Sequence, residues 1–337
     1  MRNRTLGTLG TAGLLLVSLA LAGCGSSGQS GTQESPTTKT SAGSGGQACS
    51  AVPGDQLVAL TDDKKLQTVD NIIPAVNAKA ATQPLLDALN KVQAALTSAD
   101  LIALNKSTDI DRKTSPNVAK DYVTSKDLAT GVSGGSGNIT IGAANFSENQ
   151  TLANIYKLVL DAAGFKASVK TVGNREVYEP ALEKGQLQVV PEYAGTLTEF
   201  INKAQNGASA QPIASGDLNA TVQGLTTLGD KVGLKFGQPA QAADQNTFAV
   251  TKGFADKYKV ATLSDLAAKC SSGLVLGGPP ECPTRPFCKP GLEQKYGMKF
   301  DSFTSLDAGG PLSKTALKQG KVTLALVFSS DAALASS

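Results

Sequence analysis

The stretch from Ile139 to Phe200 constrains the fold more than any other part of the chain. It opens with alternating apolar and polar residues, which predict a strand. Apolar side chains at Leu152, Ile155 and Val159 then recur at helical spacing, and Gly164 follows as a C-cap. Two further strand and helix pairs complete the stretch. This alternation predicts an α/β domain with a parallel, doubly wound sheet, which binds small ligands where its loops gather at the strand ends.

Three motifs within this stretch carry a resemblance to a known family. They read NFSENQ at residues 145–150, NREVYEPALEKG at 174–185 and PEYAGT at 191–196. In this order and spacing they resemble the substrate-binding subunits of ABC importers for glycine betaine, choline, carnitine and related osmolytes. The resemblance extends over nearly all of residues 50–337. It implies a type II periplasmic-binding-protein fold, in which two doubly wound lobes close on a ligand about a hinge.

The absence of histidine narrows the chemistry that the chain can perform. The sequence has 337 residues, of which 41% are hydrophobic and 18% charged, and its formal net charge is +3. Without histidine, serine hydrolysis of the usual kind and most zinc sites are excluded. The near balance of charges argues against a nucleic-acid partner. No acidic pair or nucleophile motif in the sequence indicates an enzyme, and we expect no cofactor and no metal.

Residues 1–23 read as a lipoprotein signal peptide. A basic start precedes an apolar run from Ala12 to Ala22, which is too short to cross a bilayer. The run leads into LAGC, which resembles the lipobox of bacterial lipoproteins and implies acylation of Cys24. The alternative is an ordinary signal peptide with an incidental cysteine. Residues 24–47, rich in Gly, Ser and Thr, are predicted to be a lipid-anchored flexible tether to a solute-binding domain at 48–337.

The segments of the resembled family come in an unusual order. LTDDKKLQTVDNIIPAVN and the apolar helices after it, up to residue 128, resemble the family's final third, yet here they come first. A Gly/Ser linker at residues 130–138 then leads into the family's usual opening strand. We therefore predict a circularly permuted domain, the alternative being a partial duplication or a mis-assembled gene. In this order the first lobe spans about residues 56–242 and the second about 244–331.

Four cysteines besides Cys24 predict two disulfides in an exported protein. Cys282 and Cys288 lie in a loop with two prolines between them, so we pair them with each other. Cys49 and Cys270 pair by elimination, and we expect this bridge to tie the N-terminal end of the domain to the second lobe. The alternative for the closely spaced pair is a metal site.

The resemblance also implies a ligand site. A quaternary ammonium is held best by aromatic faces, whereas a carboxylate needs Arg, Lys or backbone N–H groups. Tyr193 and Thr196 match a cage tyrosine and a ligand-facing threonine of the family. Glu281 and Arg285 match an acidic residue and the arginine that grips the carboxylate of betaine, although Arg285 could instead form a structural ion pair with Glu281.

The remaining candidates depart from the family pattern. Phe248 and Phe328 stand where tyrosines are usual, and the alternative for both is a place in the core. Asn149 replaces a glutamine, and Ala144 replaces a frequent lysine. Asp70 falls near a position that is often tyrosine, where it could pair with a ligand cation or be a solvated loop acid.

These features predict the solute-binding component of an ABC importer, anchored to the outer face of the cytoplasmic membrane. As a monomer it would capture glycine betaine or a related quaternary-ammonium or zwitterionic osmolyte and deliver it to a permease and its ATPase. Two alternatives remain open, namely a binding protein for an aromatic or apolar ligand and a surface sensor without transport.

Overall fold

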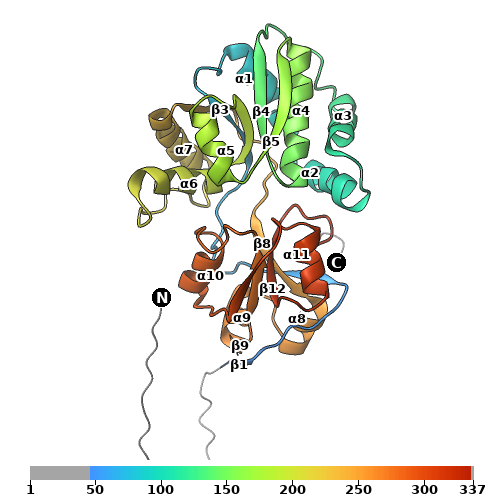
Figure 1. Cartoon of the computed structure of the whole chain (residues 1–337), viewed down its shortest axis with the longest axis vertical. Coiled ribbons are helices and arrows are strands. Elements are labelled where there is room, and N and C mark those ends of the chain that lie inside the picture. Colours follow the sequence, from blue (N-terminus) through green and yellow to red (C-terminus); the bar gives the residue numbers. More distant parts are fainter. Residues whose placement is uncertain (1–45, 335–337) are drawn as a thin grey trace, which may run out of the picture. The chain divides into compact units, whose positions relative to one another are not determined.

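Two five-stranded sheets, both packed with helices, organise the part of the chain that the structure describes (Figure 1). The structure is a computed structural model that describes residues 46–334, all of which lie within one unit. We call the half built on the sheet β5-β4-β6-β3-β7 lobe I, and the half built on β11-β10-β12-β8-β2 lobe II. Both lobes are α/β, which confirms the predicted fold class.

The elements of lobe I follow one another along the chain. They are β3 (Ile72–Asn77), α1 (Gln83–Ala95), α2 (Ser98–Asn105), the π-helical segment η1 (Lys106–Ile110), α3 (Ser115–Ser125), β4 (Asn138–Ala144), α4 (Ser147–Ala163), β5 (Lys166–Gly173), α5 (Arg175–Glu183), β6 (Val189–Tyr193), α6 (Ala194–Asn206), α7 (Leu218–Val232) and β7 (Leu234–Phe236).

The stretch from Ile139 to Phe200, with which the sequence analysis began, forms the centre of lobe I. It folds as β4, α4, β5, α5, β6 and α6, which confirms the expected alternation. Helix α4 buries the apolar stripe and ends at Gly164, whose φ of 107° is a left-handed conformation that favours glycine. Strand β4 pairs in parallel with both β5 and β6. The carboxyl ends of these strands therefore reach the same edge of the sheet.

Lobe II is assembled from two parts of the chain. From the N-terminal part come β1 (Gln47–Ala48) and β2 (Leu57–Leu60), and the rest are β8 (Asn246–Thr251), α8 (Lys252–Tyr258), α9 (Leu263–Lys269), β9 (Cys270–Ser272), β10 (Val275–Gly278), α10 (Lys289–Tyr296), β11 (Ser302–Ser305), α11 (Pro311–Lys318) and β12 (Leu324–Phe328).

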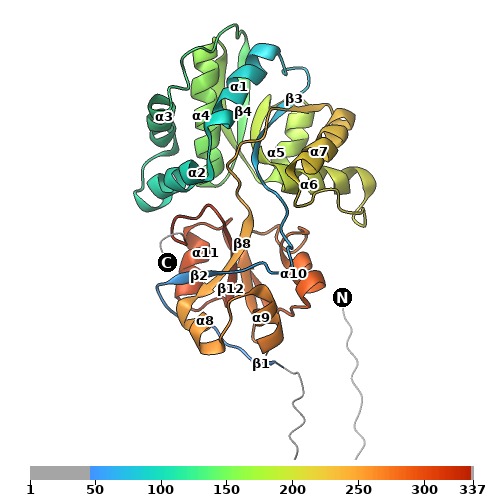
Figure 2. The same cartoon turned by 180° about the vertical axis from the view of Figure 1, so that it is seen from behind.

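Strand β2 belongs to lobe II, although the sequence analysis assigned it to the first lobe. It pairs antiparallel with β8, and Figure 2 shows this blue strand among elements coloured orange and red. The start of lobe I, expected at about residue 56, therefore moves to the crossing at Asp70 and Asn71. The apolar strand pattern could not reveal this, because the pairing partner of a strand is set by residues far along the chain.

Two extended segments cross between the lobes side by side. One connects β2 to β3 and the other connects β7 to β8 (Figure 1). Asn71 and Ala243 form an antiparallel bridge between them, and the Asp244 N–H donates to the Asp70 carbonyl oxygen at 2.9 Å. Beyond β12, the Ser329 N–H donates to the Gln245 carbonyl oxygen, also at 2.9 Å. Adjacent crossings of this kind form a hinge between lobes.

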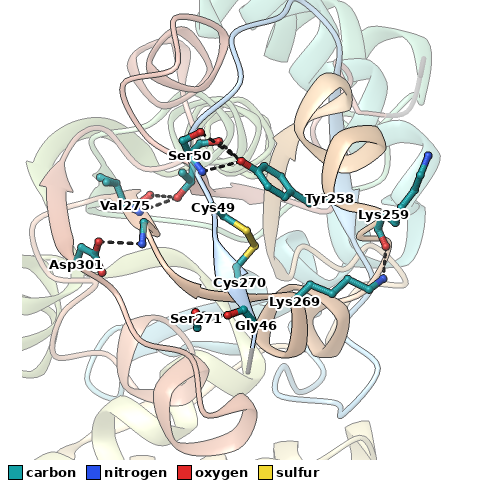
Figure 3. Close-up of a disulfide and its surroundings, with 12 residues drawn as sticks. Gly46, Cys49, Ser50, Tyr258, Lys259, Lys269, Cys270, Ser271, Val275 and Asp301 are labelled. Carbon is teal, nitrogen blue, oxygen red and sulfur yellow. Dashed lines mark hydrogen bonds between the residues drawn. A yellow bond between two sulfur atoms is a disulfide. The ribbon is translucent and has the colours of Figure 1, made fainter. Parts of the chain in front are cut away.

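The structure contains a disulfide between Cys49 and Cys270 and another between Cys282 and Cys288. Figure 3 shows the first, which joins the residue after β1 to the first residue of β9. Nearby, the Ser50 N–H donates to the Tyr258 hydroxyl at 2.9 Å. Since β2 also lies in lobe II, this disulfide is internal to lobe II and fixes the start of the described chain there.

Within residues 46–334, none of the helices has the length and apolar character needed to cross a bilayer. The predicted signal peptide, Cys24 and most of the predicted tether lie outside the described residues.

Candidate functional site

A cavity of about 430 Å³ lies between the two lobes. Lobe I contributes the carboxyl ends of β4 and β6 and the starts of the helices that follow β4, β5 and β6. Lobe II contributes the disulfide-closed loop between β10 and α10 and the end of β12. The cavity therefore occupies the position at which open α/β sheets bind ligands, and its volume suits a small molecule.

One wall of the cavity is aromatic. Phe146 stacks against Tyr193 of lobe I, with ring centroids 6.2 Å apart, and against Phe328 of lobe II, with centroids 5.6 Å apart. All three side chains line the cavity. Tyr178, Phe200 and Phe287 contribute further aromatic surface. Faces of this kind attract an organic cation through the ring quadrupole.

The hydroxyl group of Tyr193 is fixed by a buried carboxyl group behind the wall. It donates to Glu148 Oε1 at 2.8 Å, and Glu148 Oε2 accepts from Asn105 Nδ2 at 2.5 Å and from Ser330 Oγ at 2.7 Å. Burial raises the pKa of Glu148, although these hydrogen bonds oppose the rise. Since Ser330 follows β12 of lobe II, this hydrogen-bond network links the Tyr193 hydroxyl of lobe I to lobe II through Glu148.

Asp70 lines the cavity from the first hinge crossing and is only 3% exposed. Its Oδ1 accepts from the Thr196 N–H at 2.8 Å, near the start of α6. Burial raises the pKa of Asp70 to about 7, although the Thr196 N–H and the charge of Arg175 oppose the rise. The position excludes the alternative of a solvated loop acid.

Asp244 lines the cavity from the second crossing and is 4% exposed. Its Oδ1 accepts from the Ser330 N–H at 2.9 Å, whereas Oδ2 has no hydrogen-bond partner among the described residues. Burial, reinforced by the charge of Glu148, raises the pKa of Asp244 well above its usual value. The lining of the cavity thus includes a buried carboxyl group from each crossing.

Arg175 provides a buried positive charge that is already compensated. Its Nε and Nη2 donate to the two carboxylate oxygens of Glu192 at 2.8 and 2.6 Å, and Nη2 also donates to Thr196 Oγ1 at 2.9 Å. Glu192 in addition accepts from the Tyr178 hydroxyl at 2.8 Å. This bidentate pair holds α5, β6 and α6 together behind the cavity.

Arg285 forms ion pairs across the opening between the lobes. Its Nε and Nη2 donate to Glu176 of lobe I at 3.1 and 2.8 Å, and Nη2 lies 3.3 Å from Glu281 of lobe II. Although burial alone would raise it, the hydrogen bonds and charge of Arg285 hold the pKa of Glu176 below its usual value. Arg285 therefore forms the ion pair with Glu281 that was stated as the alternative, and it forms a closer one with Glu176.

The structure brings most of the predicted site residues together at this cavity. Those that line it are Asp70, Tyr193, Thr196, Glu281, Arg285 and Phe328. Phe248 and Asn149 do not line it. Phe248 is 1% exposed in the core of lobe II, and Asn149 is fully buried, where it accepts from the Ala144 N–H and donates to the Pro191 carbonyl oxygen, both at 2.8 Å. Their roles are structural.

The lining residues that the sequence analysis missed include Phe146, Arg175, Glu176 and Asp244. The first three stand in the quoted motifs NFSENQ and NREVYEPALEKG, so the signal was present for them. Asp244 stands two residues before β8, and only the pairing of the two crossings makes it a neighbour of Asp70.

A protein-family model described as the substrate binding domain of ABC-type glycine betaine transport systems matches residues 50–125 and 137–337. The chain belongs to this family. The resemblance drawn from the three sequence motifs is thereby confirmed. The two matched blocks of this substrate-binding domain leave out residues 126–136, which include most of the Gly/Ser linker.

A relative within the curated proteins is the glycine betaine-binding protein YehZ of Escherichia coli (strain K12), which is 29% identical over 206 residues. The match covers 58% of this chain and 66% of YehZ, so the chain spans just under two thirds of the length of that relative. A solved structure titled as a glycine betaine/carnitine/choline ABC transporter is 24% identical, with a TM-score of 0.38, and covers 59% of this chain and 71% of its own.

Among the described residues, no three histidine, cysteine or acidic side chains are grouped so that they could hold a metal ion. Cys282 and Cys288 are joined to each other, and both are buried beside the cavity.

Proposed function

We propose that the protein captures a small organic cation outside the cytoplasmic membrane and delivers it to the permease of an ABC importer. Membership of the glycine betaine substrate-binding family supports this role. The observation that carries the proposal is the cavity between the lobes, where the rings of Phe146, Tyr193 and Phe328 share one space with the buried carboxyl group of Asp70. Aromatic faces and a desolvated carboxylate together favour a positively charged guest.

Binding would follow from closure of the lobes about the two crossings. Phe328 of lobe II then completes the wall begun by Phe146 and Tyr193, and the pair between Arg285 and Glu176 holds the opening shut. Exclusion of water strengthens each charged contact inside the cavity. We expect the ligand to be released chemically unchanged.

Titration calorimetry of the purified protein with choline, glycine betaine and carnitine tests this function. We expect at least one of these quaternary ammonium compounds to bind and Phe328→Ala to weaken that binding. The uncharged isostere of choline, 3,3-dimethylbutan-1-ol, serves as the control for charge. No binding by any of the three quaternary ammonium compounds would refute the proposal, and equal binding of the uncharged isostere would favour the alternative of an apolar ligand.

We also propose that Cys24 is acylated and anchors the protein to the outer face of the cytoplasmic membrane. The proposal rests on the LAGC sequence at residues 21–24 and the apolar run before it. Incorporation of labelled palmitate into the wild-type protein, and its loss in Cys24→Ser, would support the anchor. Labelling that persists in Cys24→Ser would contradict it.

We infer that the domain is circularly permuted. Strand β2 comes early in the chain yet completes the edge of the lobe II sheet, whose other strands lie between Asn246 and Phe328. A rearranged chain tests this inference. It would start at Gly137, run to Leu334 and then join residues 49–126 through a short Gly/Ser connection. We expect it to fold and bind the same ligand with unchanged affinity, whereas failure to fold would count against the inference.

A further inference from the structure

The two guanidinium groups that line the cavity are both engaged by carboxylates of the protein itself. Arg175 is held by both oxygens of Glu192, and Arg285 by both oxygens of Glu176 with Glu281 alongside. A bidentate pair uses the planar fork through which arginine recognises a carboxylate, so a ligand carboxylate would have to displace a glutamate.

The charges around the cavity also favour a cation. The lining contains the acidic side chains Asp70, Glu176, Glu199, Asp244 and Glu281, and the basic side chains Arg175, Lys203 and Arg285. The charge of Arg175 is in turn balanced by Glu192, which lies outside the lining. With its groups ionised, the lining is therefore negative overall. A second negative group would be repelled there, in a site where water screens charge poorly.

Lys203 is the remaining basic side chain of the lining, and it has no ion-pair or hydrogen-bond partner among the described residues. It lies seven residues beyond Thr196 on α6, and the Thr196 N–H is the group that contacts Asp70. Seven residues of α-helix correspond to about 10 Å. This is the separation of the two backbone positions, and carnitine, the longer zwitterion, tests whether the ammonium group of Lys203 binds a ligand carboxylate.

The loop before α11 lines the cavity at Ala308, and the N-terminus of that helix is also occupied. Asp307 accepts from the Leu312 and Ser313 N–H groups, both at 2.9 Å. The backbone donors that commonly bind an anion are thus already paired with a carboxylate of the protein.

We propose that the cavity selects organic cations that carry no carboxylate, and that Glu176 determines this selectivity by occupying the guanidinium group of Arg285. The inference rests on the proposed function, because it concerns the ligand of the same site. Choline and glycine betaine form a matched pair for it, since they share the trimethylammonium group and differ only in an alcohol against a carboxylate.

The experiment compares these two ligands, and carnitine as a longer zwitterion, by titration calorimetry of the purified protein at pH 8. We expect choline to bind roughly 30-fold or more tightly than glycine betaine, the ratio expected when a desolvated charge is left unpaired. Asp70→Asn should remove choline binding, whereas Asp256→Asn, which removes an exposed carboxylate on α8, should leave it unchanged.

Glu176→Gln tests the role of the ion pair directly. The substitution leaves Glu281 as the remaining carboxylate partner of Arg285 and weakens the contact that holds the opening shut, which affects both ligands alike. The affinity for glycine betaine relative to that for choline should therefore rise at least tenfold. Glu293→Gln is the matched control, because it removes an ion pair with Lys289 on α10, outside the cavity.

The outcomes separate this inference from the proposed function. Glycine betaine or carnitine binding as tightly as choline would overturn the inference while leaving the proposed function intact. If Glu176→Gln did not raise the affinity for glycine betaine relative to that for choline, the role of Glu176 would be overturned. Absence of binding for all three ligands would overturn the proposed function and, with it, the inference.

Discussion

Replacing Asp70 by Asn is expected to stabilise the unliganded protein at alkaline pH. In the folded protein burial raises the pKa of Asp70 from 3.8 to about 7. Between these values the unfolded chain has lost a proton that the folded protein keeps, so stability falls as pH rises through this range. A difference of about three pKa units at about 1.4 kcal/mol each amounts to about 4 kcal/mol, lost progressively between about pH 4 and pH 8.

The variant Asp70→Asn removes the loss of stability at alkaline pH but keeps the main hydrogen bond of the side chain. Its side-chain oxygen can still accept from the Thr196 N–H, and it has no charge to desolvate. Around Asp70, the charge of Arg175 favours the ionised carboxylate and that of Glu192 opposes it. We therefore expect equal stability near pH 4 and a variant more stable by up to about 4 kcal/mol at pH 8. For a chain of this size the gain corresponds to a rise in Tm of roughly 6 °C.

The assay is thermal unfolding of both proteins without ligand, followed by circular dichroism from pH 4 to pH 8. Glu148 and Asp244 also have raised pKa values and are present in both proteins, so their own contributions largely cancel. The charge of Asp70 helps to raise the pKa of Asp244, and the difference between the curves includes this interaction. Asp256→Asn controls for the loss of a surface charge. The reasoning would be refuted if the variant were no more stable than the wild type at pH 8, or if the difference in stability between the two proteins did not change with pH.

Three further outcomes are expected. Glu192→Gln should destabilise the protein by about 3–5 kcal/mol in urea unfolding, because Arg175 is left as an uncompensated buried charge; a loss below about 1 kcal/mol would contradict this. Phe146→Leu should weaken choline binding roughly 3- to 30-fold in calorimetry, since it removes the central ring of the aromatic wall, and unchanged affinity would argue against a cation held there. Replacing Cys49 and Cys270 together by alanine should lower stability by about 2–5 kcal/mol while leaving ligand affinity unchanged, because the bridge lies within lobe II; a large loss of affinity would show that the bridge also constrains the site.

Local patterns made the centre of lobe I predictable from the sequence. The apolar stripe of α4 and the C-cap at Gly164 depend on residues a few positions apart, and both are found as expected. The motifs also indicated where the ligand site lies, because they stand at the carboxyl ends of parallel strands, which meet at one edge of the sheet.

Contacts between distant segments were not predictable in the same way. Strand β2 lies in lobe II because it pairs with β8. Arg285 forms its ion pair with Glu176, which belongs to the opposite lobe. Phe248 illustrates the same limit, since an aromatic residue in an alternating strand pattern does not indicate which face of the sheet it occupies. The sequence identified residue types suited to a site but not which of them meet across the hinge.

The attachment of β1 to β9 has a mechanical consequence. Figures 1 and 2 show β1 at the end of lobe II away from lobe I. A pull exerted on the chain ahead of Gln47 is resisted by this short strand pair and the Cys49–Cys270 covalent link, both within lobe II. The load therefore does not pass through the crossings at Asn71 and Ala243. A protein held by that end can therefore open and close its lobes without tension on the hinge.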